Sequence, residues 1–240
     1  MRLTIIGCSG SMSGPQSSAS SYLVQADGVD ADGAVWDPQL QVPGAFNVSN
    51  AACALAACAS GGPLVTGTPR APIDPNDKVQ CISYAPFRDN QTSLSPATQV
   101  TPEQIAEDLA QLAKISHCIR TYATDLGLDQ IPGLAAKAGL KVIQGIFLDR
   151  DRKKNATQVE TAIRLAREYP DTIIALVVGN EVLLRKEMAA SDLAALIRSI
   201  KAQVTVPVTY AEVWEFWLSN RELSDAVDFV TIHILPYWEN

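Results

Sequence analysis

The string Val178-Gly179-Asn180-Glu181-Val182 places a carboxylic acid directly after an apolar, β-branched run. A carboxylate at this point needs a reason, because the residues before it are typical of a buried strand. If Glu181 lies in a partly desolvated cleft, its pKa would rise and it would suit the protonation of a leaving oxygen. Asn180 beside it could hydrogen-bond a hydroxyl of the same substrate. The alternative is a helix-capping Asn followed by an exposed Glu, and the residue types do not separate the two.

The segments that must position this acid alternate regularly from Lys78 onward. Short β-branched runs predict six strands, near residues 79–87, 117–123, 141–148, 173–180, 207–214 and 228–235. Helix-period segments between them are typical of βα units and a parallel sheet. An open doubly wound sheet is the alternative, but it normally carries a glycine-rich turn after its first strand, and Arg88-Asp89-Asn90-Gln91 follows here. The sequence therefore predicts an α/β fold, a TIM-type (β/α)8 barrel that is incomplete, with about six βα units.

Local signals predict where the helices begin. Thr101-Pro102-Glu103-Gln104 supplies an N-cap, a proline at the first helical position and a capping-box Gln. Further helices are expected around residues 130–137, from Asn155, after an N-cap at Ser191 and around residues 220–226. In a barrel, the loops that precede these helices gather at the carboxyl ends of the strands, where Glu181 would lie.

The first 77 residues have a different character. They are rich in Gly, Ser, Pro and Ala, and we predict a mosaic region and linker over 1–77 with no complete domain, followed by a barrel domain over 78–240. Residues 2–7 and 21–25 could form two strands. An incomplete barrel leaves an open strand edge, and these two strands are candidates to cover it.

Composition excludes several classes of function. A net charge of −7 argues against a nucleic-acid partner, which requires clustered cations. The five cysteines show no CxxC spacing and are interpreted as reduced, buried thiols. No run approaches the length of a transmembrane span and no signal peptide is evident, so the chain as written is expected to be cytoplasmic. The oligomeric state is not predicted.

Five blocks carry a family resemblance across residues 78–240. They appear in a consistent order and at plausible spacing: Ile82–Phe87, Ile119–Tyr122, Val177–Arg185, Thr209–Trp217 and His233–Asn240. Together they resemble bacterial members of glycoside hydrolase family 17. The resemblance implies action on β-1,3-linked glucans by a retaining two-carboxylate mechanism, as a hydrolase or transglycosylase.

The same resemblance assigns roles to individual residues. Glu181 would be the general acid/base and Asn180 a sugar ligand. Three aromatic residues, Tyr84, Tyr122 and Tyr237, would line the sugar subsites, since aromatic faces suit pyranose rings. No metal or organic cofactor is implied.

The family pattern is incomplete at its C-terminal end. The family's nucleophilic Glu follows strand seven, whereas the sequence ends at Asn240, shortly after the sixth predicted strand. Because retaining hydrolysis needs both carboxylates, we expect weak or no hydrolysis from this chain, and whether it is an enzyme stays open. The alternatives are a non-catalytic carbohydrate-binding or scaffold protein, or a fragment or chimera without an evolved function.

Two weaker resemblances lie in the N-terminal region. Residues 1–25 resemble the opening of a metallo-β-lactamase-fold hydrolase, although that family's metal-binding histidine cluster is missing. Residues 34–59 resemble a fragment of the UDP-MurNAc-peptide ligases without their phosphate-binding loop. Neither fragment would bring its function with it, and a plain turn and helix cap is an alternative for the second.

Overall fold

The computed structural model describes residues 2–6, 23–27, 78–89 and 91–233. Within these ranges the strands form one eight-stranded sheet in the order β2-β1-β8-β7-β6-β5-β4-β3. From β3 to β8 every neighbouring pair is parallel. The strands are β1 (Arg2–Ile6), β2 (Leu23–Asp27), β3 (Ile82–Ser83), β4 (Cys118–Arg120), β5 (Lys141–Ile146), β6 (Ile173–Asn180), β7 (Val208–Val213) and β8 (Thr231–His233).

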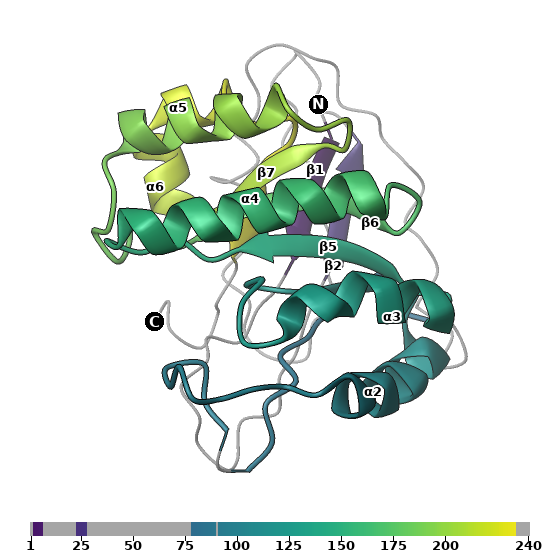
Figure 1. The fold of residues 1–240 in the computed structure, drawn as a ribbon. Coiled ribbons are helices and arrows are strands. Elements are labelled where there is room, and N and C mark those ends of the chain that lie inside the picture. The colour runs from purple at the N-terminus through teal and green to yellow at the C-terminus, as the bar shows by residue number, and fades with distance from the viewer. Residues whose placement is uncertain (1, 7–22, 28–77, 90, 234–240) are drawn as a thin grey trace.

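Helices connect the parallel strands and cover one face of the sheet. Figure 1 shows α4 running across β5 and β6, with α5 and α6 on one side of it and α2 and α3 on the other. The helices are α2 (Pro102–Ile115), η1 (Leu128–Gln130), α3 (Ile131–Ala138), α4 (Arg152–Glu168), α5 (Ala190–Lys201), α6 (Trp214–Ser219) and α7 (Arg221–Ser224). This curled parallel sheet with external helices is an incomplete (β/α) barrel of six strands, as the sequence predicts.

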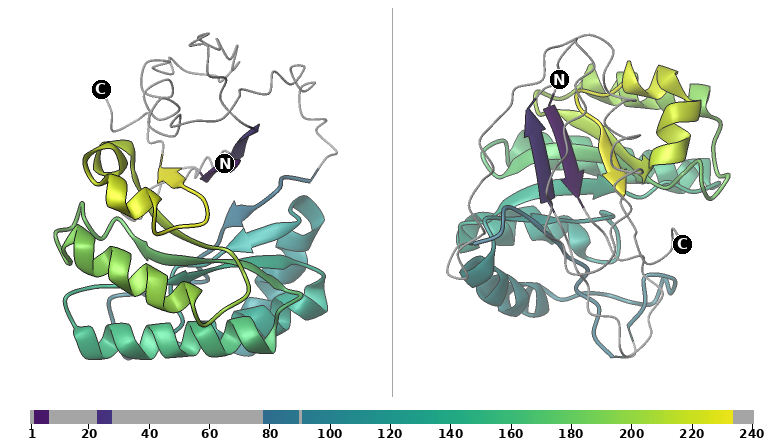
Figure 2. Two further views of the ribbon diagram at one scale, coloured as in Figure 1. Left: turned by 90° about the horizontal axis from the view of Figure 1, so that it is seen from above. Right: turned by 180° about the vertical axis from the view of Figure 1, so that it is seen from behind.

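The two N-terminal strands extend this sheet at its C-terminal edge. β1 pairs antiparallel with β2, and it pairs in parallel with β8 through Thr4↔Thr231 and Ile5↔Ile232. The prediction of two short strands near residues 2–7 and 21–25 is confirmed. Seen from above, this hairpin lies across the sheet from α4 and α5 (Figure 2). The sixth barrel strand is therefore not an open edge, because β1 occupies its free side.

The helix starts agree with the sequence in part. Thr101 caps α2, its hydroxyl accepting a hydrogen bond from the Gln104 backbone N–H at 3.2 Å. The Gln104 side chain does not return to the cap. It donates to the Pro86 carbonyl and bonds to Gln91, and so ties the segment after β3 to α2. A Gln at this position can bond either the backbone of the N-cap residue or a nearby loop, and here it bonds the loop.

Two other predicted helix starts are wrong by a few residues. α4 begins at Arg152, where Asp151 accepts from two backbone N–H groups as N-cap, and not at Asn155. α5 begins at Ala190 after Ala189, so Ser191 lies inside the helix and caps nothing. Asn155 is instead buried in the first turn of α4, where its side chain bonds the backbone of Asp149. This contact anchors the loop that follows β5.

The core has two parts, one on each face of the sheet. The larger part lies between the sheet and the helices and includes Ile105 and Leu109 of α2. The smaller part lies on the other face and combines Cys81, Cys118, Ile143, Ala175, Val177 and Ala211. Side chains alternate between the faces along each strand, so a residue's place in the strand decides which core it joins.

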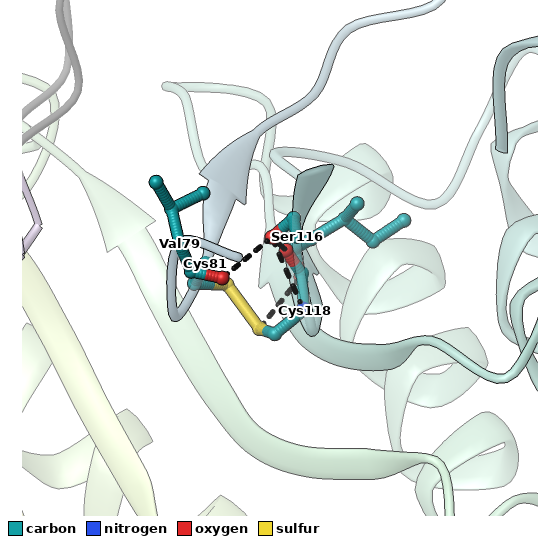
Figure 3. Close-up of a disulfide and its surroundings, with 5 residues drawn as sticks. Val79, Cys81, Ser116 and Cys118 are labelled. Atoms are coloured by element: carbon teal, nitrogen blue, oxygen red, sulfur yellow. Dashed lines mark hydrogen bonds between the residues drawn. A yellow bond between two sulfur atoms is a disulfide. The ribbon is translucent and has the colours of Figure 1, made fainter. Parts of the chain in front are cut away.

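A disulfide bond joins the starts of the first two barrel strands. Cys81 and Cys118 are bonded across a Cα–Cα distance of 4.2 Å. The prediction of reduced thiols is wrong for this pair, because the parallel register Ile82↔Ile119 sets the two cysteines side by side. Figure 3 shows the bond next to Ser116, whose hydroxyl contacts the carbonyls of Val79 and Cys118. Sequence separation of 37 residues hides this proximity.

Candidate active site

An irregular turn presents Glu181 at the carboxyl end of β6. The register between β6 and β7 shifts between Val177 and Asn180, and Gly179 adopts φ +88°. A Cβ at Gly179 would lie 2.6 Å from the Val182 side chain, so glycine is required there. Glu181 itself has φ +54°, an uncommon conformation for a residue with a side chain. Backbone strain of this kind is often found at functional sites, where the surroundings hold it in place.

The Glu181 carboxylate contacts a buried histidine from β8. Its Oε1 lies 2.7 Å from Nδ1 of His233, whose side chain is 1% exposed while that of Glu181 is 22% exposed. The hydrogen bond to His233 lowers the pKa of Glu181, against the opposing effect of burial. The expectation of a raised pKa from desolvation is therefore wrong for the unliganded site, because the hydrogen bond from His233 outweighs the effect of burial. Burial lowers the pKa of His233 in turn.

A buried arginine from β4 holds Asn180. Nη2 of Arg120 donates to the Asn180 Oδ1 at 2.6 Å, and its guanidinium lies 4.0 Å from the centroid of the Tyr122 ring. Among the described residues, Nε and Nη1 of Arg120 and Nε2 of His233 have no hydrogen-bond partner although they are buried. Buried polar atoms normally have partners, so these atoms without partners near Glu181 indicate a place for a polar ligand or water.

Two further charged residues fix the turn around Glu181. Arg185 donates to the Asn180 carbonyl and, at 2.9 Å, to that of Leu148, and it pairs with Glu187 at 2.7 Å. Glu212, on β7, is 0% exposed and accepts from the backbone N–H groups of the residues after Glu181. Together these contacts connect the ends of β5, β6 and β7.

The structure brings some of the predicted site residues together and places others elsewhere. Asn180 and Glu181 lie at the carboxyl end of β6, and Tyr122 follows β4, which β5 separates from β6 in the sheet. Tyr84 is buried in the helix-side core and donates to Oδ2 of Asp108 on α2 at 2.9 Å, so its hydroxyl has a structural partner. Tyr237 lies outside the described residues. The sugar-binding roles of these residues stay predictions.

Sequence reasoning missed the contacts that Arg120, His233, Arg185 and Glu212 make around Glu181. A weak signal for three of these residues is present in the printed sequence. Arg120, Glu212 and His233 each fall within a short β-branched or apolar run, where a charged or titratable side chain is unusual. The contacts themselves depend on the order of the strands in the sheet, and spacing along the chain does not reveal them.

Two classes of site are not found in the described ranges. No group of three or more His, Cys, Asp or Glu residues is arranged there to hold a metal ion. No helix within residues 78–233 is long and apolar enough to cross a membrane.

The fold and the site define a class: a (β/α)-barrel protein with a carboxylic acid at the carboxyl end of a central strand. Residues 81–240 match the family described as the BtgE/BtgC glycoside hydrolase domain. This match covers more than half of the chain, and the chain belongs to that family.

Two curated relatives with this similarity come from fungi. The chain is 31% identical over 145 residues to a probable beta-glucosidase btgE of Aspergillus flavus, covering 57% of this chain and 24% of the relative. It is 30% identical over 148 residues to a glucan 1,3-beta-glucosidase of Candida albicans, covering 55% of this chain and 48% of the relative. The chain thus spans between about a quarter and a half of the length of these relatives.

Solved structures support the fold. A beta-1,3-glucanosyltransferase of glycoside hydrolase family 17 from Rhizomucor miehei aligns with a TM-score of 0.55 at 22% identity, over 67% of this chain and 59% of that one. An endo-laminarinase from Formosa aligns with a TM-score of 0.56 at 20% identity, over 66% of this chain and 50% of that one. The resemblance to the family-17 fold is confirmed. The findings do not support the weaker resemblances of residues 1–25 and 34–59.

Proposed function

We propose that this protein acts on β-1,3-linked glucans as a glycoside hydrolase or transglycosylase, with Glu181 as its general acid/base. The observation that carries the proposal is the position of Glu181: it follows a central strand of a glycoside hydrolase domain, half-buried and bonded to His233 at 2.7 Å. The names of the relatives supply the substrate class. A glucan 1,3-beta-glucosidase and a beta-1,3-glucanosyltransferase both resemble this chain.

The state of Glu181 fits both halves of such a reaction. In the free site the bond to His233 favours the ionised carboxylate, which is the form that deprotonates an attacking water or sugar hydroxyl. A glucan bound over the site would remove water from the exposed part of the carboxyl group. Desolvation raises a carboxyl pKa, and a protonated Glu181 can then donate to the leaving oxygen.

Glu212 is unsuited to the role of second carboxylate. Its Oε2 accepts from the N–H groups of Leu183 and Leu184 and from the Tyr210 hydroxyl, and its Oε1 accepts from Val213 N at 2.9 Å. A nucleophile needs a free oxygen directed at the sugar, whereas these oxygens are occupied. We therefore assign the acid/base role and leave the nucleophile unassigned.

Reducing-sugar release from laminarin by the purified chain tests the proposal. The test compares the wild type with Glu181→Gln and with Glu215→Gln, which removes an exposed carboxylate on α6. Release that Glu181→Gln lowers by at least about 100-fold, and that Glu215→Gln leaves unchanged, supports the proposal, since general acid–base catalysis contributes about 10²–10⁴-fold.

A folded wild type that releases no sugar contradicts catalysis by this chain. Calorimetric titration with laminarin oligosaccharides then separates the remaining possibilities. Binding without turnover indicates a carbohydrate-binding protein. The absence of binding contradicts the proposal that the protein recognises β-1,3-glucans.

A further inference from the structure

The segment after Glu181 is a turn whose first N–H groups find their acceptors outside it. Arg185 N donates to the Glu181 carbonyl at 2.9 Å, Lys186 N to Leu183 at 2.9 Å and Glu187 N to Val182 at 3.0 Å. The first N–H groups of any helical turn have no acceptor within the turn. In an isolated helix a Ser, Thr, Asp or Asn just before the turn accepts from them. Here Glu181 occupies that position, because its carbonyl accepts the first bond of the turn, and its side chain is bonded to His233 instead.

Glu212, which lies on β7, supplies the capping side chain instead. Its Oε2 accepts from the N–H groups of Leu183 and Leu184, each at 3.2 Å. The carboxylate is completely buried, and Tyr210 and Val213 donate to it and fix its orientation. Burying a carboxylate is costly, so one that is held by four donors from two elements needs a structural or functional reason.

A second contact from β7 fixes the start of the turn. Glu181 N donates to the Ala211 carbonyl of β7 at 2.8 Å, directly before Glu212. β7 therefore binds the backbone on both sides of the Glu181 side chain. Glu181 has a positive φ, and a strained backbone of this kind persists only where the surrounding contacts hold it.

We propose that Glu212 is a positioning residue that caps the turn over residues 181–187 and thereby directs the Glu181 carboxylate at His233. The proposal rests on the proposed function for its effect on catalysis, but its effect on geometry is independent of it. Glu212 does not touch the substrate. It sets the direction of the group that does.

Glu212→Gln is the variant that tests this role. Gln keeps the size and shape of Glu, but its NH₂ group is a donor, so it cannot accept from the turn and from Val213 at once. We expect kcat on laminarin to fall about 10- to 100-fold, with KM within about twofold, because a small misplacement of a catalytic group costs up to about 10²-fold.

Nitrogen NMR of the imidazole rings provides a readout that does not require activity. The chain has two histidines, His117 and His233, so His117→Asn assigns both signals. We expect Glu212→Gln to shift the His233 Nδ1 signal away from its hydrogen-bonded position. Ile105→Val on α2 is the control for a general loss of stability, and it should leave that signal in place.

Each outcome decides the proposal. A shifted His233 signal in Glu212→Gln, with Ile105→Val unchanged, supports it even if the wild type proves inactive, in which case only the proposed function fails. A folded Glu212→Gln whose His233 signal and kcat match the wild type overturns it. If Glu212→Gln does not fold, amide exchange in the wild type decides: slow exchange at Leu184, whose side chain is exposed, supports the cap, and rapid exchange there overturns it.

Discussion

At the scale of single residues, one hydrogen bond links Glu181 to His233 and influences the pKa of each. Glu181 and His233 share a hydrogen bond, and their pKa values are both lower than usual, Glu181 chiefly through that bond and His233 chiefly through burial. Because burial opposes the charge of His233, the folded protein resists protonation of the imidazole. The site therefore favours a neutral histidine beside an ionised acid.

The pH dependence of stability follows from these directions. The unfolded chain protonates His233 near its ordinary value of 6.5, while the folded chain protonates it only at lower pH. Stability should therefore fall as pH drops below about 6.5, by at most about 1.4 kcal/mol per pH unit for one such group. The lowered pKa of Glu181 adds a loss in the same direction below about 4.5, through its own folded pKa.

Glu212 contributes with the opposite sign. Burial raises the pKa of Glu212 above 4.5, so its contribution to stability is present below pH 4.5 and is lost as pH rises through the raised value.

Urea unfolding of the wild type and of His233→Gln between pH 5 and 7 measures the contribution of the histidine to the pH dependence of stability. We expect the unfolding free energy of the wild type to fall relative to that of His233→Gln as pH drops below about 6.5. A difference between the two proteins that is independent of pH would contradict this expectation.

Sequence reasoning locates the acid but not its partners. Gly179-Asn180-Glu181 stands out because a carboxylic acid follows a strand. The partners come from β4, β7 and β8, and their distance to Glu181 depends on strand order and register. A single sequence carries no direct information on either, which is why the contacts of Arg120, His233 and Glu212 could not be predicted.

At the scale of elements, the disulfide connects β3 to β4 at the ends opposite the site. Cys81 and Cys118 close a segment that contains all of α2, with a sequence separation of 37 residues. Crosslinking a loop of this length reduces the entropy of the unfolded chain and typically stabilises by about 3–4 kcal/mol.

The double variant Cys81→Ser/Cys118→Ser tests this contribution. We expect its unfolding free energy in urea to be lower than that of the oxidised wild type by about 2–4 kcal/mol. The double variant should not respond to reductant, whereas the wild type should. Equal midpoints for the oxidised wild type and the variant would show that the bond does not stabilise the fold.

Elements with strong local signals were predictable. The Thr101-Pro102 start of α2 follows from capping chemistry that involves neighbouring residues. α5 has no side-chain cap, and Ser191 offered a plausible but unused one. The cysteine pair and the β1–β8 pairing depend on residues far apart in sequence. Local signals did not predict the disulfide bond.

At the scale of the whole molecule, the N-terminal hairpin completes the sheet next to the site. β1 pairs with β8 through Thr4↔Thr231 and Ile5↔Ile232, and His233 follows directly on β8. An uncovered β8 would expose unpaired backbone groups and be prone to associate with other edges. The hairpin therefore stabilises the strand that carries the partner of Glu181.

Hydrogen exchange in the full chain and in a variant lacking residues 1–27 tests this contribution. We expect the amides of Thr231 and Ile232 to be protected in the full chain and to exchange faster in the shortened one, by about tenfold or more if the pairing contributes about 1.4 kcal/mol. The amides of Val142 and Ile143 on β5 serve as the internal control. Equal exchange of the β8 amides in the two proteins would contradict the pairing.

We predict that Glu181 donates a proton to the leaving oxygen of a β-1,3-glucan. The most direct measurement compares Glu181→Ala with the wild type on laminarin and on a laminaribioside with a 2,4-dinitrophenolate leaving group, which departs without protonation. We expect a loss of at least about 100-fold on laminarin and a much smaller loss in the release of dinitrophenolate from the activated substrate. Equal losses on the two substrates would contradict the acid role, and unchanged activity on laminarin would remove Glu181 from the mechanism.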